Sequence, residues 1–181
     1  MRILKTSGLA FLLAVSGTHG GAAAQSARAE AVPYSGVMEA VVNGQRRALE
    51  QQSVTMRINA GVMQLGSGEM FYELQGVRSS VRFTASDKVH FVMRSLGEGV
   101  DPATTVALYR AEPKKKKFRR VKISRGGLSV GMTADLSRGS LAMRFEPAGR
   151  SLIRVHPDAP LPAGEYVLVS MASRAFAFGI D

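Results

Sequence analysis

Apolar and polar residues alternate along most of this chain in short stretches. In 88–94, for example, Val89, Phe91 and Met93 share one face, and His90, Val92 and Arg94 share the other. The same alternation recurs over 79–84, 104–110, 118–124, 141–146, 151–156 and 165–171, with further apolar stretches at 69–74 and 176–180. A period of two is typical of half-buried β-strands. The chain is therefore predicted to be rich in β-strands.

Turn-forming residues separate these stretches at short intervals, among them Gly66, Gly76, Gly126 and Gly164. The only helix candidate is 45–52, which is short and polar and follows the dipeptide Asn43-Gly44, so it equally fits an edge strand after a tight turn. Many short strands without a long helix favour an all-β fold. We expect a single antiparallel β-sandwich of the immunoglobulin-like or jelly-roll type. A small β-barrel is the alternative.

The first 24 residues have the three parts of an export signal. Arg2 and Lys5 supply a basic start, an apolar run of about ten residues follows, and small residues up to Ala24 provide a cleavage site. Spanning a bilayer takes about twenty apolar residues, so we expect no membrane anchor. The predicted organisation is a signal peptide at 1–24, a flexible lead-in at 25–32 and a β-sandwich domain at 33–181. Cleavage after Ala29 or Ala31 is an alternative.

The absence of cysteine narrows the class of exported protein. Without cysteine the chain has no disulfide and no lipid anchor of the bacterial lipoprotein type, so core burial alone must stabilise the domain. Exported domains of this kind are common in a bacterial periplasm, and we infer a Gram-negative source. The expected location is the periplasm or the medium, after removal of the signal peptide.

The chain is strongly basic, with 24 Lys and Arg residues against 14 Asp and Glu residues. This excess predicts attraction to polyanions such as anionic lipids or acidic glycans. It also fits a role in solubility alone. The basic residues gather between two predicted strands, which predicts a positive hairpin. Its candidate binding residues for an anionic partner are Lys114, Lys115, Lys116, Lys117, Arg119, Arg120 and Lys122.

The basic run also has a purely structural interpretation. A lysine-rich tip stays solvated, and lysines on an edge strand discourage pairing between sheets. A nucleic-acid site is not expected, because the export signal separates the chain from nucleic acid and Phe118 is the only aromatic residue in the run.

No motif in the sequence predicts catalysis, a metal site or a cofactor. The Gly-x-Ser-x-Gly nucleophile elbow is missing. His90 and His156 lie 66 positions apart, and no ligand pattern surrounds either of them, so both are interpreted as structural histidines. We therefore expect a protein that is not an enzyme and that needs no cofactor.

The stretch 159–170 predicts a structural corner. Pro160 and Pro162 extend the chain, Gly164 allows a turn, and Tyr166 begins an apolar strand with its hydroxyl placed for a hydrogen bond back to the loop. A tyrosine at such a corner recurs in β-sandwiches.

Five segments together resemble a group of uncharacterised exported bacterial proteins with a Pro-x-Gly-Glu-Tyr-like motif near the C-terminus. The segments are 76–83, 99–102, 108–110, 160–166 and 178–181. The resemblance implies a β-sandwich module. It implies no known activity and no catalytic or binding residue.

Three functions remain open from the sequence. The first is an exported envelope module that binds an anionic polymer, a lipid surface or an envelope protein through the basic hairpin. The second is a structural or accessory domain of a secreted assembly. The third is a small hydrolase whose site has no recognisable motif.

Overall fold

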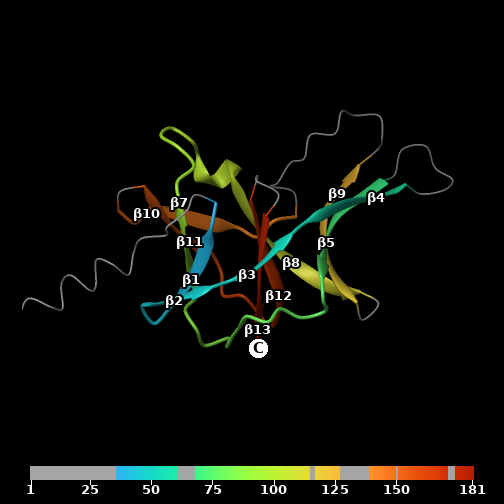
Figure 1. Cartoon of the computed structure of the whole chain (residues 1–181), viewed down its shortest axis with the longest axis horizontal. Helices are drawn as coiled ribbons and strands as arrows, with labels where there is room; N and C mark the ends of the chain where they lie inside the picture. Colours follow the sequence, from blue (N-terminus) through green and yellow to red (C-terminus); the bar gives the residue numbers. More distant parts are fainter. Residues whose placement is uncertain (1–35, 61–67, 115–116, 127–138, 150, 171–173) are drawn as a thin grey trace, which may run out of the picture. The chain divides into compact units, whose positions relative to one another are not determined.

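The computed structural model describes residues 36–60, 68–114, 117–126, 139–149, 151–170 and 174–181 (Figure 1). All of them belong to one compact unit, Ala31–Asp181. The predicted signal peptide at 1–24, the predicted lead-in at 25–32, Lys115 and Lys116 lie outside the described residues.

The described residues form thirteen β-strands and one short 3₁₀ turn, η1. The strands of the first half are β1 (Met38–Val42), β2 (Gln45–Ala48), β3 (Glu50–Ser53), β4 (Thr55–Ala60), β5 (Gly68–Gln75), β6 (Arg82–Phe83) and β7 (His90–Arg94). The second half contains η1 (Pro102–Thr104), β8 (Val106–Lys114), β9 (Phe118–Gly126), β10 (Met143–Pro147), β11 (Leu152–Pro157), β12 (Gly164–Ser170) and β13 (Arg174–Ile180).

These strands form two sheets. The smaller sheet has the order β10-β11-β7-β1-β2, and all its pairs are antiparallel. The larger sheet has the order β3-β13-β12-β8-β9-β5-β4, and β6 joins it by pairing in parallel with β13. The chain passes from the smaller sheet to the larger one at Leu49, which is buried between β2 and β3.

The larger sheet curls until it nearly closes on itself, because its two edge strands, β3 and β4, are separated in the chain by Val54 alone. The side chain of Gln52 on β3 bridges the remaining gap to β5. Its amide oxygen accepts from Gln75 N at 2.8 Å, and its amide nitrogen donates to Gln75 O at 3.2 Å. One side-chain amide thus replaces a pair of main-chain hydrogen bonds where the barrel-like sheet stays open.

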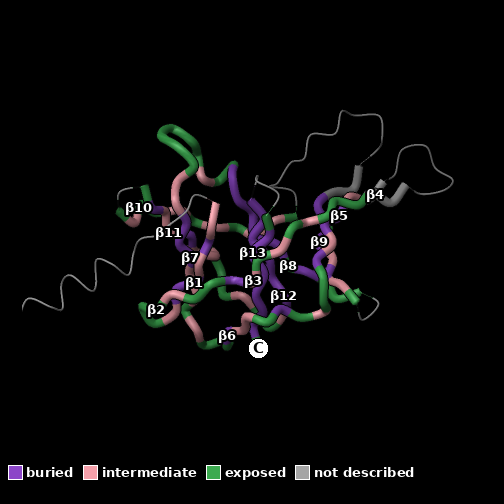
Figure 2. Tube along the Cα trace, viewed as in Figure 1, coloured by how far each residue is buried: buried purple, intermediate pink, exposed green. Residues whose placement is uncertain are grey.

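Strands β12 and β13, with residues 106–109 of β8, form a wall that is buried on both faces (Figure 2). One face packs against the smaller sheet, with Leu108, Leu168 and Phe178 among the buried residues of that core. The opposite face points into the curled sheet, where small side chains such as Ala107 and Ala177 line a second core. The wall is therefore shared by a sandwich and a barrel.

The predicted all-β class and the packing of antiparallel sheets are confirmed, and the curled larger sheet also has the character of the barrel alternative. The expectation that strands are half-buried is wrong for the wall, since 166–170 are buried on both faces. The helix candidate at 45–52 is strand, as its alternative held. Asn43 and Gly44, with φ of 51° and 76°, form the tight turn before it.

Candidate functional site

The basic run forms the β8–β9 hairpin, as predicted. Lys114 and Lys117 are exposed at its end, where Lys117 N donates to Lys114 O at 3.1 Å. Lys122 is exposed further along β9, on the face opposite buried Val121 and Ile123. Three of the predicted binding cations therefore reach solvent from the hairpin.

The acidic side chain of Glu112 marks where these cations converge. Lys114 Nζ lies 2.8 Å from Glu112 Oε2. The hydrogen bond from Lys114 holds the pKa of Glu112 below its ordinary value, and the charges of Lys122 and Arg110 lower that pKa further. Glu112 thus pairs with one lysine of the hairpin and also responds to the charges of two further cations.

Arg120 has structural partners on the outer face of the curled sheet. Its guanidinium lies 4.0 Å from the ring centroid of Phe71 and 5.0 Å from that of Phe118. Its Nη2 also lies 3.3 Å from Glu73 Oε1. Stacking and an ion pair hold this side chain against the sheet, so Arg120 is a weaker candidate for binding than the lysines.

Arg119 does not belong to a docking surface, which corrects the prediction for this residue. Its side chain is only 1% exposed. Alternation along β9 places it on the same face as Val121 and Ile123, which turns it into the domain. The sequence contained this signal, but the surrounding lysines and arginines concealed it.

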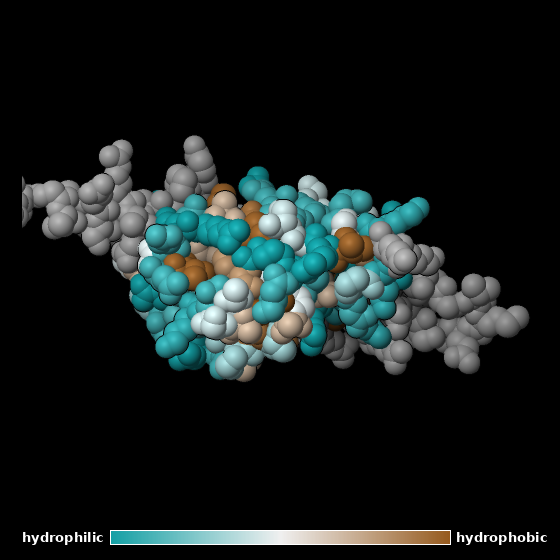
Figure 3. Space-filling model, turned by 90° about the horizontal axis from the view of Figure 1, so that it is seen from below, coloured by the Kyte–Doolittle hydropathy of each residue, from teal (hydrophilic) through white to brown (hydrophobic). Residues whose placement is uncertain are grey.

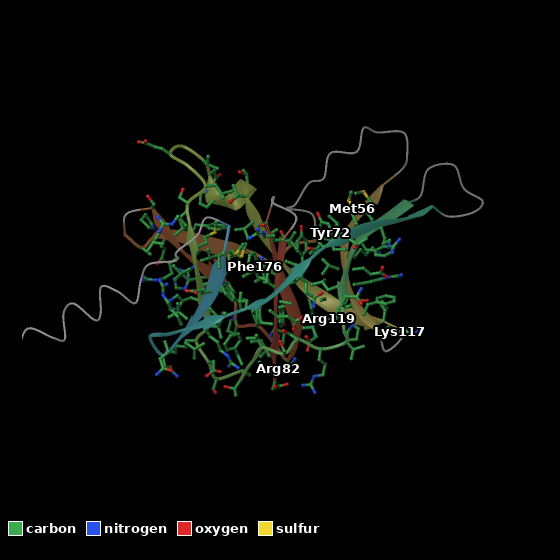
Figure 4. All side chains as sticks on the ribbon, in the orientation of Figure 1. Met56, Tyr72, Arg82, Lys117, Arg119 and Phe176 are labelled. Carbon is green, nitrogen blue, oxygen red and sulfur yellow. The ribbon has the colours of Figure 1, made fainter. Side chains whose placement is uncertain are left out.

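The Arg119 guanidinium is the centre of a buried charged network at one end of the curled sheet (Figure 4). Nη2 donates to Glu50 Oε1 at 2.7 Å, and Nη1 donates to Glu165 Oε2 at 3.3 Å. Main-chain oxygens of Gln75 and Gly76 accept from the same guanidinium at 2.9 and 3.1 Å. The network therefore ties β3, β9, β12 and the end of β5 together.

The two carboxylates of this network also hold the segment that follows β5. Ser79 N donates to Glu165 Oε2 at 2.7 Å, and Ser80 N donates to Glu50 Oε2 at 2.6 Å. Burial favours a higher pKa for Glu50, but hydrogen bonds from Ser80, Ser79 and Arg119 outweigh it and lower this pKa. Glu50 thus stays ionised in the folded protein.

Arg82 extends the network to the end of the chain. Its guanidinium donates to Glu165 and to Asp181, and Nε lies 3.0 Å from Asp181 Oδ2. Those contacts with Asp181 raise the pKa of Arg82, and Glu165 adds to the effect. A Cβ atom at Gly179 would collide with this guanidinium, so only glycine at this position gives the Arg82 side chain enough room.

A groove opens beside the hairpin and this network. It has a volume of about 660 Å³, and its lining combines residues of β8 and β12 with the segment after β5. The lining includes Val77, Arg78, Arg110, Glu112, Pro113 and Gly164. Figure 3 views the side of the domain that carries β6 and the C-terminus, and most of this side is hydrophilic.

The predicted tyrosine corner is present. Tyr166 donates its hydroxyl hydrogen to Pro162 O at 2.6 Å, and its ring stacks on Phe178 at 5.5 Å between centroids. The Arg110 guanidinium packs closely against Gly164. A Cβ atom at this position would lie only 3.3 Å from two of the guanidinium nitrogens. Gly164 and Arg110 both line the groove, so the corner also positions part of the groove wall.

The two histidines, far apart in sequence, meet on the outer face of the smaller sheet. The rings of His90 on β7 and His156 on β11 stack with centroids 5.1 Å apart. His156 Nε2 lies 3.5 Å from Glu146 Oε2 on β10. Within the described ranges, no group of three or more His, Cys, Asp or Glu side chains is arranged to hold a metal ion.

This histidine pair predicts a specific loss of stability in acid. Burial lowers the pKa of His90, and the charges of His156 and Arg154 lower it further. The unfolded chain therefore binds the proton first as the pH falls below the ordinary value of 6.5. The stability from neutral His90 is complete above that pH and is lost between 6.5 and the lowered folded pKa.

The measurement is the urea midpoint of wild type and His90→Gln at pH 7.5 and pH 5. We expect a smaller drop between the two pH values in the variant. Carboxylates such as Glu50 are present in both proteins, so the difference reports the loss of His90 from the histidine pair. An equal drop in both proteins would contradict the prediction.

Comparison of the chain with protein-family models, with curated proteins and with solved structures found no match. The resemblance to exported bacterial proteins therefore stays a prediction. Over the described ranges, no helix is long and apolar enough to cross a bilayer.

Proposed function

We propose that this chain is an exported, non-enzymatic envelope module that binds an anionic polymer through the end of the β8–β9 hairpin. The observation that carries the proposal is that Lys114, Lys117 and Lys122 are all exposed on this one hairpin, where Glu112 pairs with Lys114. Exposed cations that outnumber the neighbouring acids give a surface positive charge, and such charge attracts polyanions. The predicted signal peptide supports a partner outside the cytoplasm.

The groove favours a polymer chain over a lipid surface as the partner. Its arginines, Arg78 and Arg110, lie within a hollow beside the hairpin end. A flexible anionic chain follows a hollow, whereas the flat headgroup layer of a bilayer contacts protruding charges. The proposal therefore commits to an anionic polymer, and membrane binding is an outcome that the experiment separates.

The test measures binding of the full chain to polygalacturonate and to vesicles of anionic phospholipid at rising salt. The variant Lys114→Gln/Lys117→Gln/Lys122→Gln removes three exposed hairpin cations. A lysine near an anionic surface contributes about 1 kcal/mol, so we expect a loss of affinity on the order of 100-fold at low salt. Binding by wild type should weaken steeply as ionic strength rises.

A matched control removes the same charge elsewhere. Lys88→Gln/Arg144→Gln/Arg174→Gln alters three exposed cations away from the hairpin end, and we expect it to retain most of the binding. Equal losses in both triple variants would indicate attraction by net charge alone and would contradict the proposal. Absence of polymer binding by wild type would favour a structural role, and tighter binding to vesicles would favour a lipid surface.

A further inference from the structure

The groove beside the hairpin has the size and the chemistry of a small-ligand site. Its volume of about 660 Å³ lies within the range of about 300 to 1,000 Å³ that is typical of ligand pockets. Its walls alternate between apolar surface, from Val77 and Pro113, and charged groups, from Arg78, Arg110 and Glu112. Mixed surfaces of this kind suit a ligand with both C–H faces and polar groups.

The two arginines are held in place by the protein. Arg78 Nη2 donates to Asp181 Oδ1 at 2.9 Å, and Arg110 Nη2 donates to Ala163 O at 3.1 Å. Gly164 lets the Arg110 guanidinium lie close to the main chain of β12. Each guanidinium has five N–H donors in a fixed fork. Each of these hydrogen bonds positions one guanidinium and uses one of its N–H donors, so the remaining donors can bind a carboxylate of the ligand.

The acids of the groove decide which anion fits. The Glu165 carboxylate accepts from Ser79, Arg82 and Arg119, so its charge is compensated within the network. Glu112 is exposed, and Lys114 Nζ lies 2.8 Å from its Oε2 atom. The charge of Glu112 opposes the second negative charge of a dianion such as a phosphate monoester. An anion with a single charge and neighbouring hydroxyl groups fits better, because Glu112 accepts hydrogen bonds from hydroxyls.

We propose that this groove binds one acidic sugar unit, whose carboxylate is held by Arg78 and Arg110 and whose hydroxyls donate to Glu112. The inference rests on the proposed function for its ligand class, since the sugar unit would belong to the bound polymer. The hairpin lysines then supply long-range attraction along the polymer, while the groove supplies recognition of one unit.

The test is calorimetric titration of the full chain with trigalacturonate, with neutral maltotriose and with glucose 6-phosphate. Wild type should bind trigalacturonate more tightly than the other two ligands. Hydrogen bonds to charged groups are strong, so Arg78→Gln/Arg110→Gln should weaken trigalacturonate binding by at least about tenfold. Arg110→Lys keeps the charge but loses the planar fork, so it should recover only part of the affinity in the Arg78 background.

Two further variants separate this inference from the proposed function. The hairpin variant Lys117→Gln, which keeps the Lys114–Glu112 pair, should bind the trimer within about threefold of wild type and the long polymer about fivefold more weakly. Arg144→Gln, far from the groove on β10, should match wild type. Thermal midpoints check folding. Substitutions at Arg78 and Arg110 should not change these midpoints, because both residues are exposed.

Two results would overturn the inference. One is that wild type binds trigalacturonate no more tightly than maltotriose. The other is that Arg78→Gln/Arg110→Gln binds it as wild type does. If either occurs while the triple hairpin variant loses polygalacturonate binding, the groove proposal fails and the proposed function stands. Tightest binding of glucose 6-phosphate would show that the groove prefers a dianion and would also overturn the inference.

Discussion

Replacing Arg119 with methionine is expected to lower the free energy of unfolding by about 3 to 5 kcal/mol, the range for breaking a buried ion pair. Methionine fills similar space but supplies none of the hydrogen bonds. Glu50 and Glu165 lose their shared cation, and the main-chain oxygens of Gln75 and Gly76 lose a donor. Urea unfolding at pH 7.5 measures the loss.

Arg57→Met is the matched control for this prediction. Arg57 also pairs with a glutamate, Glu73, at 3.3 Å, but its side chain is 62% exposed. An exposed ion pair contributes about 0 to 1 kcal/mol. A loss in Arg119→Met that is no larger than the loss in Arg57→Met would show that the network contributes little to stability.

Replacing Phe178 with alanine should cost about 3 to 5 kcal/mol of unfolding free energy, the range for large aromatic residues in a core. Phe178 on β13 is completely buried. Its ring lies 5.1 Å from Phe91 of the smaller sheet, 5.5 Å from Tyr166 and 6.0 Å from Phe83. The substitution therefore opens a cavity where the two sheets meet, and chemical denaturation monitored by circular dichroism measures its effect.

Phe118→Ala provides the comparison. Phe118 is half-buried on the hairpin, and its described ring contact is with Arg120. We expect a cost of about 1 kcal/mol, since an exposed cation–π pair contributes about 0.5 to 1 kcal/mol. Similar costs for the two variants would mean that Phe178 does not join the sheets.

Local chemistry was sufficient to predict most of the strands. The alternation predicted that Phe91 and Met93 of β7, with Val89 just before it, share one face, because neighbouring side chains on a strand must point to opposite sides. Asn43-Gly44 predicted the first tight turn because both residues tolerate positive φ. The hydrogen bond from the Tyr166 hydroxyl to Pro162 O was also predictable. Its acceptor lies only four positions earlier, in the proline-rich loop that leads into the strand.

The candidate site was only partly predictable. The run of lysines identified a basic hairpin, because charge is a property of the residues themselves. The same run obscured the different role of Arg119. Its inward orientation follows from the alternation with Val121, but its hydrogen-bond partners cannot be derived from that alternation. Glu50 and Glu165 lie 69 and 46 positions away from it along the chain. Nothing local connects three such residues.

The amino-acid sequence alone set the strands, their turns, the tyrosine corner and the positive hairpin, since each depends on residues within a few positions. Packing of the sheets set the rest. It buried β12 on both faces, stacked His90 on His156 and placed Arg78 and Arg110 in the lining of one groove. These contacts join residues more than thirty positions apart, so they exist only once strand order and register bring the segments together.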